Sequence, residues 1–319
     1  MPTTGKGWQK WLTVLATSDV ARDIFNGIET KTDKANFLGF SHPFSSAWLS
    51  AAPDSFTNIQ NDIFLEAIAV RCGVPSTLVD HTCRCTATAK GKTVTITPAS
   101  ALQHAHSLSN EARSIQTSRH EAVKWTFTNE MRTLLGLNNV VAEKGGKHNA
   151  DKSGYMTRLE KNGNFHKNAT FPDQFMCADL FVRLGDANLA LDVNVAFAGG
   201  THEGPSAAGA GFGVKRGSVA DQHSNIKQKN YASLYDFNPN FLVPITFETN
   251  GCPGTSTVSF LGAVKKWIRE EGSTIQKKAV GTCIRRLVIK TSVSLARSLG
   301  SSVLAYRKVC QKGAGLAGT

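Results

Sequence analysis

The chain has 319 residues and carries 36 Lys and Arg against 24 Asp and Glu, which gives a formal net charge of +12 at pH 7. Apolar residues make up 41% of the sequence and charged residues 19%, a composition that excludes an intrinsically disordered chain and predicts packed cores in one or two domains. The positive charge points to polyanionic partners such as nucleic acid or anionic lipid.

The sequence also argues against a membrane or secreted protein. No uninterrupted apolar stretch reaches the roughly 20 residues that a membrane-spanning helix needs. The opening residues from Met1 to Lys10 lack the apolar segment of a signal peptide. The seven cysteines are an odd number, mostly far apart, which suits reduced thiols. We therefore expect a nuclear or cytoplasmic protein that is not secreted and has no membrane partner.

Three regions follow one another along the chain. Residues 1–80 are predicted to form a helical leader, in which apolar residues of 58–72 recur at the helical period. Residues 81–118 contain a β-like stretch at 93–97 and too few large apolar residues for a core of their own. Residues 119–319 alternate predicted helices and strands, so this last region is expected to be an α/β domain.

The α/β domain opens with an amphipathic helix over 119–137, and short apolar segments bounded by Gly, Asn, Asp or Pro predict its strands. The two central strands are joined by Gly185-Asp186-Ala187-Asn188, which predicts a hairpin. A Gly-rich stretch after the hairpin is interpreted as a mobile loop. The strands are predicted at 139–143, 178–184, 189–197 and 241–248, the loop at 198–225, and later helices at 226–234, 258–269 and 275–309.

Two aspartates interrupt the apolar strands of this hairpin. Asp179 and Asp192 are separated by twelve residues, and a buried carboxylate is costly unless it is paired or binds a cation. Two carboxylates on adjacent antiparallel strands can share one divalent ion, Mg²⁺ or Mn²⁺. Lys227 or Lys229 on the following helix can supply positive charge beside that ion, and such a set suits phosphodiester hydrolysis. The alternative interpretation is that both aspartates are ordinary turn or cap residues.

Cysteines and histidines gather in the second region. Cys83 and Cys85, together with His104 and His106, could hold zinc in a tetrahedral site, which would order a segment that has no core. His81 could replace one of the two histidines. Only one residue separates the cysteines, which departs from the usual spacing, so ordinary thiols and loop histidines are the competing interpretation.

Basic residues concentrate in the last two predicted helices. Eight Lys and Arg and no Asp or Glu lie between Gln276 and Gln311, where apolar residues at helical spacing supply a buried side. This pattern predicts a face that binds nucleic-acid phosphates, and a solvated surface is the alternative. The residues expected to contact nucleic acid are Lys277, Lys278, Arg285, Arg286 and Lys290.

In their order, these motifs resemble the C-terminal region of site-specific non-LTR retrotransposon polyproteins. There, a cysteine/histidine knuckle precedes an Arg-His helix and a restriction-like endonuclease of the PD-(D/E)XK superfamily. The resemblance covers most of 47–300. The matching stretches are Ala47-Trp48-Leu49, Val70-Arg71-Cys72-Gly73-Val74-Pro75, Cys83-x-Cys85, His104-Ala105, Arg119-His120-x-Ala122-Val123, Ala178-Asp179-Leu180-Phe181-Val182, Leu191-Asp192-Val193-Asn194-Val195, Lys227-x-Lys229-x-Tyr231 and Val243-Pro244-Ile245-Thr246-Phe247-Glu248-Thr249-Asn250-Gly251.

The resemblance implies a PD-(D/E)XK restriction-endonuclease-like mixed sheet flanked by helices, with Asp179 and Asp192 as the metal-binding acids. The lysine that normally follows the second acid by two residues is absent here, because that position is Asn194. The resemblance therefore implies that Lys227 or Lys229 replaces it.

The resemblance also bears on the helix that precedes the first strand. It implies that Arg119 and His120, the Arg-His pair of that helix, contact nucleic acid. Family members tend to carry an acid on the same helix. Glu121 and Glu130 are available, and Glu130, on the apolar side, is the catalytic candidate; pairing with a neighbour such as Lys124 or Arg132 is its alternative.

Glu248 ends the last predicted strand and could face the same site, or it could cap the turn at Asn250-Gly251.

Three functions are compatible with these features. The first is a Mg²⁺-dependent DNA endonuclease of retroelement origin. The chain lacks a Tyr-x-Asp-Asp polymerase motif, so a priming role would need a reverse transcriptase in cis or in trans. The second is a catalytically inactive nuclease-fold protein that binds nucleic acid or acts as a scaffold. The third is an RNA-binding component of a ribonucleoprotein.

Overall fold

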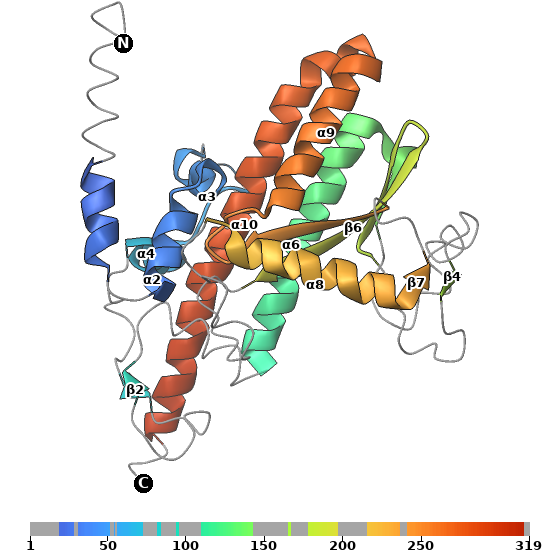
Figure 1. Ribbon diagram of the computed structural model, residues 1–319. Coiled ribbons are helices and arrows are strands. Elements are labelled where there is room, and N and C mark those ends of the chain that lie inside the picture. The colour runs from blue at the N-terminus through green and yellow to red at the C-terminus, as the bar shows by residue number, and fades with distance from the viewer. Residues whose placement is uncertain are drawn as a thin grey trace, which may run out of the picture.

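The computed structural model describes residues 19–28, 31–51, 54, 56–72, 82–83, 94–95, 110–142, 165–166, 178–196, 216–236 and 241–315. Long helices lie on both sides of a four-stranded sheet (Figure 1), so the fold is mixed α/β, as the sequence predicts. None of the helices in these residues combines the length and the apolar character needed to cross a membrane.

The main sheet contains both antiparallel and parallel pairs. Its strands, in order across the sheet, are β3 (Val140–Ala142), β5 (Leu180–Leu184), β6 (Ala187–Ala196) and β8 (Leu242–Glu248). The first three pair antiparallel, and β8 pairs parallel to β6. All four predicted strands are confirmed, with ends that move by at most two residues.

Helices cover both faces of the sheet. A parallel strand pair needs a crossover connection, and α8 (Ser218–Leu234) lies in that connection, on one face of the sheet. The helices on the opposite face share the main apolar core with the strands, and they are α6 (Asn110–Leu135), α9 (Thr255–Glu271) and α10 (Thr274–Gly315). Figure 1 shows α6 and α10 side by side and antiparallel.

The alternation of side chains along β6 separates its apolar residues from its polar ones. Leu191 and Val193 belong to the main core. Successive residues of a strand point to opposite faces, so Asp192 and Asn194 point toward α8 and contact its side chains. The apolar core thus holds the strand in place while the opposite face is left for polar groups.

An N-terminal group of helices packs against the middle of α10. It consists of α2 (Lys31–Phe40), α3 (Pro43–Ser46), the 3-10 helix η1 (Ala47–Ser50) and α4 (Asn61–Cys72). Trp48 joins a second apolar cluster with Ala67, Val293 and Ala296. Its backbone N–H also donates to Ser292 Oγ at 3.2 Å. The short strands form two separate pairs: β1 (Thr82–Cys83) with β2 (Val94–Thr95), and β4 (Phe165–His166) with β7 (Tyr235–Asp236).

The starts of α6 and α8 differ most from the sequence prediction, by eight or nine residues, whereas those of α4 and α9 differ by three. α6 begins at Asn110 and therefore crosses the expected boundary between 81–118 and 119–319. α8 begins at Ser218, so the last part of the predicted loop 198–225 is helical. The Glu248 carboxylate accepts a hydrogen bond from Val219 N at 3.2 Å. A partner from a distant strand thus satisfies the first turn of α8, and local sequence does not reveal it.

Gly300 marks a close approach between α10 and α4, because a Cβ at this position would meet the carbonyl oxygen of Ile63. Gly300→Ala should therefore lower the free energy of unfolding by about 1–3 kcal/mol through overpacking. Gly281→Ala lies on the same helix with no atom within 4 Å of the added Cβ, and should raise it by about 1 kcal/mol through helix propensity. Urea unfolding followed by circular dichroism compares the stabilities of the two variants. Equal effects would contradict the close packing of Gly300 against α4.

Candidate active site

The hairpin of β5 and β6 brings two aspartates together. Its turn consists of Gly185 and Asp186 alone, so the predicted connection 185–188 is two residues too long, because Ala187 and Asn188 already pair with β5. Gly185 has a φ of 58°, in the left-handed region that glycine adopts at little cost. The register pairs Leu180 with Leu191, so Asp179, one residue before β5, stands across from Asp192. Directly opposed residues of an antiparallel pair have Cβ atoms about 5 Å apart.

Asp192 is a buried acid with one neighbouring cation. Its side chain is 5% exposed, and Lys227 Nζ from α8 lies 2.9 Å from Oδ2, in ionic contact but without the alignment of a hydrogen bond. The pKa of Asp192 is raised to about 6, mainly by burial; Lys227 opposes the rise and the Asp179 carboxyl adds to it. An ionised carboxylate in this position would be stabilised by a further cation.

Asp179 is held in one orientation by two neighbours. Its Oδ2 accepts a hydrogen bond from Val193 N at 2.7 Å. The same oxygen lies 3.1 Å from Nε2 of His120 on α6. This hydrogen bond to Asp179 raises the pKa of His120. Sequence reasoning assigned His120 to nucleic acid, whereas the structure places it against the first acid.

Of the two candidate lysines, Lys227 is the one that reaches the acids. Lys229 is exposed, and it lies about 200° further around the helix axis. Asn194, at the position where the resemblance implies a missing lysine, has its Nδ2 3.1 Å from Nδ1 of His223. His223 and Lys227 are one helical turn apart, and this i, i+4 spacing is the sequence signal that both face β6.

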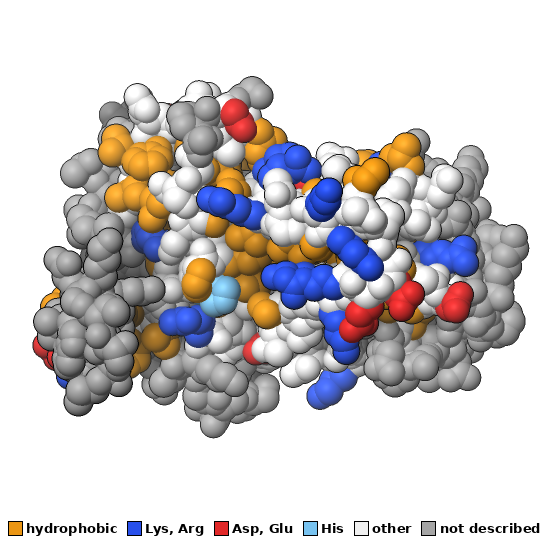
Figure 2. Space-filling model, turned by 90° about the horizontal axis from the view of Figure 1, so that it is seen from above, with side chains coloured by type: hydrophobic (Ala, Val, Ile, Leu, Met, Phe, Trp, Pro, Cys, Tyr) orange, Lys and Arg blue, Asp and Glu red, His pale blue; other side chains and the backbone are white. Residues whose placement is uncertain are grey.

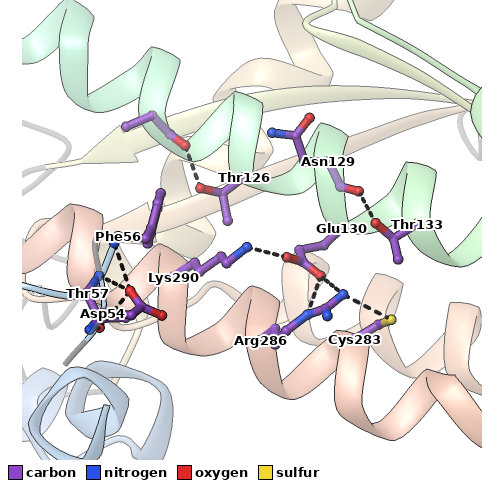
Figure 3. Close-up of polar contacts among 11 residues, drawn as sticks. Asp54, Phe56, Thr57, Thr126, Asn129, Glu130, Thr133, Cys283, Arg286 and Lys290 are labelled. Atoms are coloured by element: carbon purple, nitrogen blue, oxygen red, sulfur yellow. Dashed lines mark hydrogen bonds and ion pairs between the residues drawn. The ribbon is translucent and has the colours of Figure 1, made fainter. Parts of the chain in front are cut away.

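Glu130 lies elsewhere, between α6 and α10. Its side chain is 3% exposed; Arg286 Nη2 lies 2.9 Å from Oε2 and Lys290 Nζ 2.8 Å from Oε1 (Figure 3). It is ten residues beyond His120, about 15 Å along α6. The structure therefore does not bring Glu130 to the two aspartates. Its expected local partner Lys124 instead binds Glu121 at 2.6 Å.

Arg132, the other local partner considered for Glu130, donates from Nε to the carbonyl oxygen of Val140 at 3.1 Å.

The predicted basic face of α10 divides into two groups. Arg286 and Lys290, whose side chains are 46% and 33% exposed, neutralise Glu130. Lys277, Lys278 and Arg285 are exposed and belong to the second group. Figure 2 views the molecule from above the α9 and α10 end in Figure 1. On the side of the molecule seen in Figure 2, Lys and Arg side chains lie across the middle, beside a band of hydrophobic side chains and a few acids.

Glu248 takes the second of its two predicted roles. It lies on β8 four residues beyond Pro244, the partner of Asp192 in the register, which corresponds to about 13 Å along the strand. Its carboxylate accepts hydrogen bonds from Asn250 Nδ2 at 3.1 Å and from Val219 N. Glu248 therefore fastens the turn after β8 to the start of α8.

The zinc site stays a prediction, because only one of its four expected ligands lies within the described residues. Cys83 lies on β1, whereas Cys85, His104 and His106, with His81, lie outside the described residues. Within the described ranges, no group of three or more His, Cys, Asp and Glu is arranged to hold a metal. Two carboxylates are nevertheless sufficient protein ligands for Mg²⁺, which usually keeps several of its waters.

Comparisons with known proteins offer no further guide, because no protein family, curated protein or solved structure matches the chain.

Replacing Glu130 tests its structural role. Glu130→Gln removes a buried charge that binds Arg286 and Lys290, and should lower the free energy of unfolding by about 1–3 kcal/mol. If Asp179 and Asp192 hold Mg²⁺ as the sequence predicts, Mg²⁺ binding measured by isothermal titration calorimetry should not change in this variant. Asp192→Asn is the matched control and should abolish that binding. A folded Glu130→Gln protein that no longer binds Mg²⁺ would contradict the assignment.

Glu248 should make stability depend on pH. Burial raises its pKa from 4.5 to about 7, so the folded protein holds this proton more tightly than the unfolded chain. The resulting stabilisation is complete below the ordinary value and is lost as the pH rises through about 7. The effect corresponds to roughly 3 kcal/mol.

Urea unfolding between about pH 4 and pH 8 measures this loss. Glu248→Gln should remove most of the loss of stability with rising pH. A smaller loss should remain at lower pH, because Asp192 also has a raised pKa. Glu121→Gln, whose carboxylate is 39% exposed, is the control and should retain the full fall. An unchanged profile for Glu248→Gln would show that another group is responsible.

Proposed function

We propose that the protein is a metal-dependent endonuclease that hydrolyses phosphodiester bonds in DNA and derives from a retroelement. The observation that carries this proposal is the convergence of Asp179, Asp192 and Lys227 at one end of the β5–β6 hairpin. A buried acid, a second acid that is 14% exposed and a lysine beside them are the residue types that metal-assisted phosphoryl chemistry uses.

The order of the elements supports a PD-(D/E)XK core. α6 precedes three antiparallel strands, β3, β5 and β6, and α8 then leads to β8, which is parallel to β6. The acids lie on the central hairpin of a mixed sheet flanked by helices, as expected for the retrotransposon endonucleases that the sequence resembles.

The two aspartates suit a hard divalent cation. Asp179 and Asp192 offer carboxylate oxygens, the ligands that Mg²⁺ and Mn²⁺ prefer. Asp192 has a raised pKa because burial outweighs the single nearby lysine, so a cation at this position would stabilise its ionised form. When bound, such a metal supplies a more acidic water and a positive charge beside the phosphate.

The remaining residues take supporting roles. Lys227, whose side chain is 26% exposed, can contact a phosphate oxygen and offset the charge that develops on it. His120 keeps Asp179 in position. The exposed Lys277, Lys278 and Arg285 attract the nucleic acid. A nick in DNA would leave a 3′-OH that a reverse transcriptase, in cis or in trans, could extend.

A second candidate is a catalytically inactive nuclease fold that binds nucleic acid. It is favoured by Asn194, which stands where the lysine would be and contacts His223. In this case Lys227 serves only to balance Asp192, and the protein acts as a binding or scaffold subunit, with RNA as an alternative ligand.

Cleavage of supercoiled plasmid with Mg²⁺ or Mn²⁺ tests the proposal. Asp179→Ala, Asp192→Ala and Lys227→Met should each slow cleavage by about 100-fold or more. Lys229→Met removes the same charge from an exposed position of α8 and should stay near the wild-type rate. If the wild-type protein binds DNA but cleaves it with neither Mg²⁺ nor Mn²⁺, the result favours the inactive fold. Cleavage that persists in Asp192→Ala would refute the site.

A further inference from the structure

A histidine on α8 lies one helical turn from Lys227 and faces the same strand. His223 Nδ1 lies 3.1 Å from Nδ2 of Asn194, and Lys227 contacts Asp192. Asn194 follows Asp192 by two residues on β6, so both side chains point to the same side of the sheet, about 7 Å apart along the strand. The imidazole of His223 therefore belongs to the same polar layer as the buried acid and its lysine.

The contact with Asn194 determines which ring nitrogen of His223 carries a hydrogen. The amide nitrogen of asparagine is a donor and cannot accept a hydrogen bond. With the amide oriented as in the structure, it donates to His223 Nδ1, and that nitrogen must then be unprotonated. A neutral imidazole carries its single hydrogen on the other nitrogen. His223 therefore has an N–H donor at Nε2 without a full positive charge.

The part of α8 that carries His223 is held in place by β8 and α9. The adjacent hydroxyl, Ser224 Oγ, lies 2.7 Å from Thr246 Oγ1 and 3.1 Å from Ser256 Oγ. Ser224 is buried, whereas His223 is half-buried. A donor whose position is fixed in advance needs no reorganisation when it meets a developing charge. The surroundings of His223 thus suit a group that stabilises charge in a reaction.

We propose that His223 is a further catalytic residue, whose Nε2–H donates a hydrogen bond to a nonbridging oxygen of the phosphate that is cleaved. The inference rests on the proposed nuclease function. Negative charge develops on these oxygens as water attacks, so a fixed donor stabilises the transition state more than the bound substrate. His223 transfers no proton and stays neutral throughout. The competing role is structural, in which His223 only joins α8 to β6 through Asn194.

Single-turnover cleavage of supercoiled plasmid in Mg²⁺ distinguishes these two roles. His223→Ala removes the donor and should slow cleavage by about tenfold or more. Affinity for the plasmid in Ca²⁺ should change by less than about threefold, because the contact strengthens only in the transition state. His223→Gln keeps an amide N–H near the position of Nε2 and should recover most of the rate. Asn225→Ala, at an exposed position of α8, is the control and should keep the wild-type rate.

The position of the ring hydrogen is measured independently of activity. Long-range ¹H–¹⁵N correlation NMR of the wild-type protein should show the hydrogen of His223 on Nε2, and loss of the signals in His223→Gln assigns the ring. Asn194→Asp replaces the donating amide by a carboxylate, which only accepts, and should move the hydrogen to Nδ1.

The outcomes are distinct. An unchanged rate for His223→Ala in an active protein overturns the inference and leaves the nuclease function standing. Equal slowing in His223→Ala and His223→Gln, with a lower melting temperature for both, indicates the structural role and also overturns it. A hydrogen on Nδ1 in the wild-type protein has the same consequence. A wild-type protein that cleaves DNA with neither Mg²⁺ nor Mn²⁺ refutes the nuclease function and the inference together.

Discussion

The register of the β5–β6 hairpin is the constraint on which the site depends. Because the turn closes between Leu184 and Ala187, Asp179 stands across from Asp192. Val193 N can then donate to the Asp179 carboxylate. A four-residue loop would move the register by two residues and set Asp192 opposite Phe181. The two acids would then be separated along the strands, and no shared cation could join them.

The buried acids Glu130 and Asp192 differ in how many cations balance their charge. Glu130 and Asp192 are both buried carboxylates on elements of the main core. Glu130 is bound by two cations, Arg286 and Lys290, so its environment is complete without a ligand. Asp192 has one lysine and a second acid beside it. Burial of both residues is therefore compatible with a structural role for Glu130 and a metal-binding role for Asp192.

Local patterns in the sequence predicted the strands, the hairpin acids and the lysine-bearing helix, because apolar periodicity and strand alternation act over a few residues. The partners of Glu130 lie more than 150 residues away in the chain, and its position on an apolar helix face predicted burial without revealing what is buried with it. The start of α8 was missed for the same reason, because Glu248 from β8 satisfies its first turn. The burial of Arg119, which is 8% exposed, likewise depends on the assembled fold.

The signs of the charges suggest an order for assembly with a nucleic acid. Without a metal, Asp179 and Asp192 outnumber Lys227 and repel a phosphate, so initial affinity must come from cations that are not already neutralised. Lys277, Lys278 and Arg285 on the surface meet this condition, whereas Arg286 and Lys290, which pair with Glu130, do not. In the proposed nuclease, a divalent cation on the two aspartates would reverse the local sign of the charge and attract the scissile phosphate. Binding of the backbone and binding of the metal are then separate contributions that reinforce each other at one end of the hairpin.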